Sequence, residues 1–180
     1  MPGNRTDRIF ETLRKRNCYN APLAEADVLH FEKRYGIQLP ETYRRFITEL
    51  GDGGKGPHGF PMFTLERALT YQRPGVGDDF LRTPFPHTSS YNSADDVKYS
   101  EFFDKIDRHE LNVSDEEIVR ILMYETAGTL TLAHTGCGYF DMLVVTGPTS
   151  GQVWADGRCA DYGFKPYGCD FLDWYLEQCN

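Results

Sequence analysis

His134 and Cys137 lie three residues apart in the stretch HTGCG and could form a nucleophile with its base. A catalytic thiol needs a base within hydrogen-bonding reach, surroundings that lower its pKa, and a third group that orients the base. No clear orienting residue or oxyanion site accompanies this pair. We therefore interpret His134 as the end of a strand and Cys137 as a small packed side chain in a glycine corner. A hydrolase that uses Cys137 and His134 is the less favoured alternative.

Metal and cofactor sites lack the residue spacing that they require. A structural or catalytic metal needs three or four ligands, whereas the other histidines, at 30, 58, 87 and 109, are dispersed. The stretch GDGGKG at 51–56 lacks the order of a phosphate-binding loop, because Lys55 is followed by Gly56 and no strand precedes it. We expect no catalytic, metal-binding or cofactor-binding residue.

Trp154 is a candidate for contact with another protein. Counting alternate positions from an inward-facing Val153 places Trp154 and Asp156 on the opposite face of their strand. An aromatic side chain rimmed by acids is typical of the centre of a protein interface. The alternative is that a helix or the central loops cover this face and that Trp154 belongs to the core. With the other acidic positions, the candidate partner-binding residues are Asp78, Asp79, Asp95, Asp96, Trp154, Asp156 and Asp161.

The overall charge excludes some classes of partner. The 180 residues are 40% hydrophobic, enough to fill one core, and 27 acidic against 19 basic residues give a net charge of −8. This charge repels phosphate backbones and anionic lipids, so we expect no direct binding to nucleic acid and none to membranes. A basic protein would be attracted, although in most acidic proteins the charge only confers solubility.

The cysteines and the first residues indicate the compartment. Five cysteines, at 18, 137, 159, 169 and 179, are an odd number without a CxxC pair, so we expect reduced thiols rather than a disulfide framework. The first residues lack the apolar core of a secretory signal. The longest aliphatic run, at 142–145, is far below the roughly 18 apolar residues of a membrane span. We expect a cytoplasmic protein.

Helical periodicity dominates the first two thirds of the chain. Helices are expected at 4–17, at 23–36 with Gly36 as a left-handed cap, at 40–51, at 64–71, at 93–108 and at 114–128. Ser93 is the candidate cap of the helix at 93–108. In the helix at 114–128, a capping box precedes a buried stripe. That box is Ser114 with Glu117, and the stripe is Ile118, Ile121 and Leu122.

After Gly128 the hydrophobic period falls to two, which predicts strands at 130–134, 139–146 and 152–156, the second of them central. A docked helix behind Asp170 closes the chain. These elements predict an α+β fold in which N-terminal helices pack on an antiparallel β-meander closed by a C-terminal helix. A single domain is expected over residues 1–180, with a loop-rich variable insert at about 55–92.

Two ordered patterns resemble a known family. The first is LAEADVLHFEKRYGIQLPETYRRFITELGDGG, an acid-rich helix, then Gly-x-x-Leu-Pro, a Phe-Ile step and a glycine-rich stop. The second starts at GCGYFDMLVV, continues through a glycine turn to GQVW, and ends in an aromatic-rich helix. In this order they are similar to the SUKH superfamily, Smi/Knr type. They cover about the first and last thirds of the chain, and we recognise no known pattern in 55–112.

The resemblance implies a SUKH-like protein-binding module without catalysis. Bacterial members of this type are immunity proteins, which neutralise a cognate toxin of a polymorphic or contact-dependent toxin system. Fungal members are regulators of cell-wall synthesis and signalling, and carry long polar flanks that this chain lacks. The expected partner is therefore a cognate protein toxin, with a basic nuclease as one expected form, and the expected assembly is a monomer or weak homodimer. A regulatory scaffold that binds a non-toxin protein is the alternative.

Overall fold

The structure is a computed structural model that describes residues 5–16, 18–71, 73 and 76–177. Its helices are α1 (Arg5–Leu13), α2 (Glu25–Tyr35), α3 (Glu41–Glu49), α4 (Leu65–Thr70), α5 (Val97–Asp107), α6 (Asp115–Tyr124) and α7 (Phe171–Tyr175). Its strands are β1 (Gly54–Lys55), β2 (Pro61–Met62), β3 (Thr129–Gly136), β4 (Tyr139–Val144), β5 (Gln152–Asp156) and β6 (Phe164–Asp170). No described helix is both long and apolar enough to cross a bilayer.

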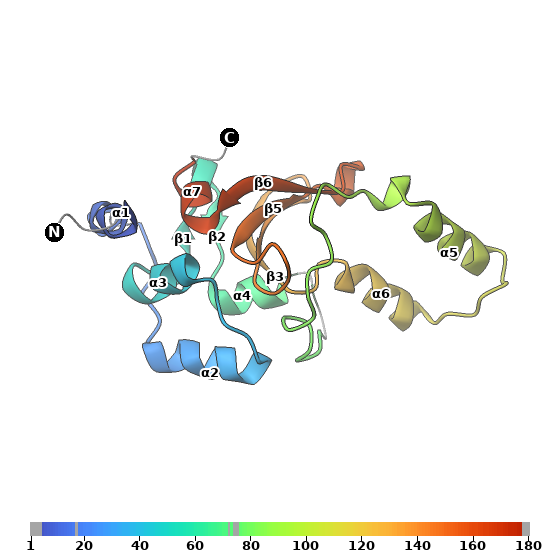
Figure 1. The fold of residues 1–180 in the computed structure, drawn as a ribbon, viewed down its shortest axis with the longest axis horizontal. Coiled ribbons are helices and arrows are strands. Elements are labelled where there is room, and N and C mark those ends of the chain that lie inside the picture. Colours follow the sequence, from blue (N-terminus) through green and yellow to red (C-terminus); the bar gives the residue numbers. More distant parts are fainter. Residues whose placement is uncertain (1–4, 17, 72, 74–75, 178–180) are drawn as a thin grey trace.

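The six strands form one antiparallel sheet in the order β1-β2-β3-β4-β5-β6. The central part of this sheet is β4, whose residues from Asp141 to Val144 are all buried, as the apolar pattern on both of its faces predicts. The N-terminal helices precede the sheet and α7 follows it (Figure 1). The predicted α+β architecture is confirmed.

Two separate apolar clusters cover the two faces of the sheet. The larger cluster joins side chains of β3, β4 and β5, such as Leu130, Leu143 and Val153, to residues of α1, α2, α3, α4 and α7. The smaller cluster lies on the opposite face and consists of Met142, Val144, Trp154 and Phe164 with Phe85 from the loop after α4. A loop therefore covers the second face of the sheet.

Several details differ from the sequence predictions. Asp96, not Ser93, caps α5, because residues Ser93–Asp95 form a separate 3-10 turn and the Asp96 carboxylate accepts the Tyr99 amide at 3.3 Å. The strand β6 was not expected, since Pro166 and Gly168 are typical of loops; it lies at the sheet edge, where proline is tolerated. The expectation of reduced thiols is wrong for Cys169, which is disulfide-bonded, whereas Cys18, Cys137 and Cys159 are free. The cysteine at 179 lies outside the described residues.

The region expected as a loop-rich insert contributes to the core. It holds β1, β2 and α4, and Phe80, Leu81 and Phe85 are completely buried. Gly128 shows how closely this region approaches the sheet: a Cβ there would lie 2.6 Å from the carbonyl oxygens of both Thr83 and Thr146. Only glycine fits this position, which also has a φ of 71°.

The segment 93–125, which we name the α5–α6 arm, extends from the sheet at the end opposite α1 and α2 (Figure 1). The capping box at the start of α6 is confirmed, because Ser114 Oγ accepts the Glu117 amide at 3.2 Å and Glu117 accepts the Ser114 amide at 3.2 Å. The predicted buried stripe is wrong: neither α5 nor α6 has a buried residue. The arm meets the larger apolar cluster at Tyr124, whose ring lies edge-to-face on Phe80 at a centroid distance of 5.6 Å.

Candidate protein-binding surface

His134 and Cys137 lie at the β3–β4 hairpin without forming a nucleophile and base. Cys137 and Gly138 make the two-residue turn, and the Gly138 amide donates to His134 Nε2 at 3.3 Å. The imidazole stacks on Phe140 with a centroid distance of 4.9 Å. Among the described residues, no hydrogen bond joins the thiol to a base or the imidazole to a carboxylate. Cys137 is exposed, so its predicted role as a packed side chain is wrong.

Trp154 is buried and does not form part of a surface. Its side chain has no exposed area, and its ring lies 5.1 Å from the Phe85 ring in an edge-to-face arrangement. The alternation from Val153 was predicted correctly, but the loop carrying Phe85 covers the face to which Trp154 points. The alternative that Trp154 is a core residue therefore describes this structure, and a partner could reach it only after this loop is displaced.

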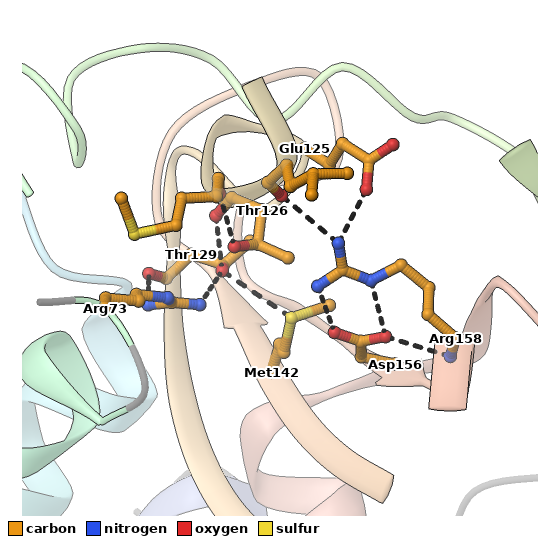
Figure 2. A network of polar contacts seen from close by, with 9 residues as sticks. Arg73, Glu125, Thr126, Thr129, Met142, Asp156 and Arg158 are labelled. Carbon is orange, nitrogen blue, oxygen red and sulfur yellow. Dashed lines mark hydrogen bonds and ion pairs between the residues drawn. The ribbon is translucent and has the colours of Figure 1, made fainter. Parts of the chain in front are cut away.

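Asp156 is also buried, as part of a polar network under the arm (Figure 2). Arg158 donates from Nε to Asp156 Oδ1 at 2.9 Å and from Nη2 to Oδ2 at 2.7 Å. Its Nη1 donates to Glu125 Oε2 at 2.6 Å and to the Leu122 carbonyl at 3.2 Å. Burial disfavours the charged guanidinium, but the two carboxylates outweigh it and raise the pKa of Arg158. The network fastens the last turn of α6 to β5.

Arg73 is a buried cation beside this network, whereas Arg158 is only half-buried (Figure 2). It donates to the Thr129 carbonyl and to Thr129 Oγ1, each at 2.9 Å, and no described carboxylate pairs with it. Burial lowers the pKa of Arg73 to about 9, so the side chain is still charged at neutral pH. With Met142 and Arg158 it lines a hollow of about 240 Å³ whose other wall is the sheet-facing side of α6.

The remaining acidic candidates fall into two groups. The first group is Asp78 and Asp79. Asp79 lies beside α6, where its Oδ1 accepts a hydrogen bond from the Tyr124 hydroxyl at 2.7 Å, and this bond lowers the pKa of Asp79. Asp78 is exposed, and its Oδ1 lies 3.6 Å from Nη2 of Arg34. The second group consists of Asp95, Asp96 and Asp161. Asn92 brings them together, because its Nδ2 donates to the Asp161 carbonyl at 2.8 Å and it closely precedes Asp95 and Asp96 in the sequence. Of these candidates, Asp79 lines the same hollow as Val119 of α6.

Those apolar residues are the feature that the sequence prediction missed. Val119 is 49% exposed, and Ile121 and Leu122 are each 37% exposed. A second hollow, of about 720 Å³, lies on the other side of Val119 and is lined by Asp79, Asp115 and Glu116. The missed signal is in the α6 sequence itself: IVRILM carries more apolar residues than one buried stripe needs.

Negative charge is concentrated on the same arm. The α5–α6 arm contains ten of the chain's 27 acidic residues and four of its 19 basic residues, so it carries a net charge of −6 out of −8. The rest of the chain is close to neutral. An exposed apolar helix face with an acidic surround is therefore the most distinctive surface of the described residues.

No group of three histidine, cysteine, aspartate or glutamate side chains within the described part of the chain is placed to hold a metal ion. No curated protein and no solved structure matches the chain. A family model does match, that of the SMI1 / KNR4 family (SUKH-1), over residues 22–167. The match includes both patterns on which the resemblance rests, except the C-terminal helix. It also spans residues 55–112, where the sequence showed no known pattern, and the rest of the arm. With most of its length matched, from before α2 to within β6, this chain belongs to the SMI1 / KNR4 family (SUKH-1).

Proposed function

We propose that this protein is an immunity protein that binds and neutralises the cognate toxin of a bacterial polymorphic or contact-dependent toxin system. Family membership supports a protein-binding role, because the bacterial type that the sequence resembles has this activity. The observation that carries the proposal is the concentration of a net charge of −6 on the α5–α6 arm. A surface of this kind selects a basic protein over nucleic acid or membrane.

A basic toxin of the nuclease type fits this charge. An enzyme that binds nucleic acid presents a positively charged active-site surface, and an acidic protein covers it by electrostatic complementarity. Opposite charges accelerate encounter, which matters when a toxin must be intercepted before it reaches its substrate. A stable complex of this kind buries about 1,600 Å² in total. The protein acts by occlusion, and we propose no catalytic step.

Co-expression with the toxin encoded in the same operon tests this function. Cells that produce the toxin should survive when they also produce this protein, and the two proteins should purify together in a one-to-one complex. Unchanged killing, or an operon without a toxin gene, would contradict the proposal. Capture of one stable housekeeping protein instead of a toxin would support the regulatory scaffold.

A further inference from the structure

The unpartnered apolar face of α6 has no explanation within the described chain. Helices gain most of their stability from packing an apolar face against a core, and α6 buries no residue. Its contacts to the body lie at its C-terminal end, where Tyr124 packs on Phe80 and donates to Asp79. Just beyond the helix, Arg158 pairs with Glu125. The helix α6 is thus attached to the body at its C-terminal end, and most of its residues are exposed to solvent.

Two hollows give this face a relief that suits a protein partner. Val119 and Met123, one helical turn apart, line both the hollow of about 240 Å³ and the hollow of about 720 Å³ and so form a ridge between them. The larger hollow carries three carboxylates, from Asp79, Asp115 and Glu116, against the single guanidinium of Arg120. An apolar ridge with a charged rim has the anatomy of a protein interface.

We infer that this ridge, Val119 with Met123, is the docking site for a basic surface of the toxin. This inference rests on the proposed function and names the part of the molecule that performs it. Apolar side chains of the toxin pack on both sides of the ridge, and lysine or arginine side chains around them meet the carboxylates of the larger hollow. A second copy of this chain is disfavoured as the occupant, because two arms that each carry a net charge of −6 repel one another.

Titration calorimetry with a catalytically inactive form of the operon's toxin tests the ridge. Val119→Ser should weaken binding about tenfold, the loss typical of an interface core residue. Leu29→Ser is the matched control, because Leu29 is an aliphatic residue with 53% exposure on α2, at the opposite end of the molecule. The control should change affinity less than twofold. Both positions are exposed, so both variants should keep the wild-type unfolding midpoint.

A second pair of variants tests the rim. D115N/E116Q removes two carboxylates of the larger hollow, and E11Q/D27N removes two exposed carboxylates from α1 and α2. The first double variant should slow association with the toxin at least fivefold at low salt, and the second should slow it less than twofold.

The outcomes separate the inference from the proposed function. Tight toxin binding by wild type with equal effects of ridge and control variants would overturn the docking site and leave the function intact. Wild-type protein that neither binds nor neutralises the toxin would overturn the function itself. Sedimentation that shows a homodimer abolished by Val119→Ser would assign the ridge to a second copy of the chain and overturn the toxin as its occupant.

Discussion

Arg158 and Glu125 form an ion pair in which Nη1 and Oε2 lie 2.6 Å apart, and this pair joins the residue after α6 to the turn after β5. The pair is largely shielded, with 31% of the Arg158 side chain and 11% of the Glu125 side chain exposed. Together with Tyr124, which packs on Phe80, this pair attaches an arm without buried residues to the body of the protein.

Replacement of Arg158 by methionine should destabilise the protein by about 2 kcal/mol. The change removes the cation that pairs with the carboxylates of Asp156 and Glu125, which remain shielded from solvent. Because Arg158 is partly exposed, we expect a cost below the ~3–5 kcal/mol of a fully buried pair. Urea unfolding measures the loss. Arg108→Met is the control, because Arg108 pairs with Asp104 at the surface, and its loss should cost less than about 0.5 kcal/mol. Equal effects of the two variants would contradict a role in fastening the arm.

The two tryptophans should respond differently to replacement by phenylalanine. Trp174 Nε1 donates to Asp141 Oδ2 at 3.0 Å, whereas Trp154 Nε1 has no hydrogen-bond partner among the described residues. Both variants lose ring volume, but only Trp174→Phe also leaves a carboxylate short of a donor. We expect Trp174→Phe to cost about 1 kcal/mol more than Trp154→Phe in urea unfolding. A larger loss for Trp154→Phe would show that its indole nitrogen is bonded.

Trp154 also shows what the sequence can and cannot predict. Alternation along β5 correctly separated Val153 from Trp154, because the period of a strand is a local property. The segment that covers Trp154 carries Phe85, about 70 residues earlier in a loop without periodicity. No local pattern could identify that contact.

In α6, too, the sequence predicted the local structure correctly but not the burial of the side chains. Its capping box, Ser114 with Glu117, was predicted because the bonds lie within four residues. Its apolar residues predicted a buried stripe, but hydrophobicity does not reveal whether the chain itself or another protein covers a helix face.

The missed strand β6 contains Pro166 and Gly168, whose local preferences are outweighed by pairing with β5.

Replacement of Cys137 by asparagine should stabilise the hairpin. Cys137 has a φ of 50° and Gly138 a φ of 83°, so the two-residue turn requires the left-handed conformation at both positions. Asparagine followed by glycine is the favoured pair for such a turn, and we expect a gain of about 0.5–1 kcal/mol. Thermal or urea unfolding checks this gain. Neutralisation of the toxin should be unchanged, whereas its loss would revive the alternative in which the Cys137 thiol has a chemical role.

Asp141 should make stability increase as the pH falls from neutral. Burial raises the pKa of this carboxyl above its ordinary value of 3.8, against the opposing hydrogen bonds from Tyr167 and Trp174. The folded protein therefore binds this proton more readily than the unfolded chain, and the charged form is a cost at neutral pH. Unfolding free energies of wild type and Asp141→Asn, measured from pH 7 to pH 4, should shift in favour of wild type on acidification. A shift in the other direction would mean that the hydrogen bonds dominate.

Association with the toxin should depend steeply on salt. The arm places a net charge of −6 on one end of the molecule. Salt screens this charge from an approaching basic surface, because the Debye length shortens from about 10 Å at 0.1 M salt to about 3 Å at 1 M. Stopped-flow measurements should therefore show an association rate at least tenfold lower at 1 M salt than at 0.1 M, with a much smaller change in the dissociation rate. D115N/E116Q should flatten this dependence more than E11Q/D27N does, although both remove two charges. An equal flattening would mean that the net charge of the whole chain, rather than the charge of the arm, steers the encounter.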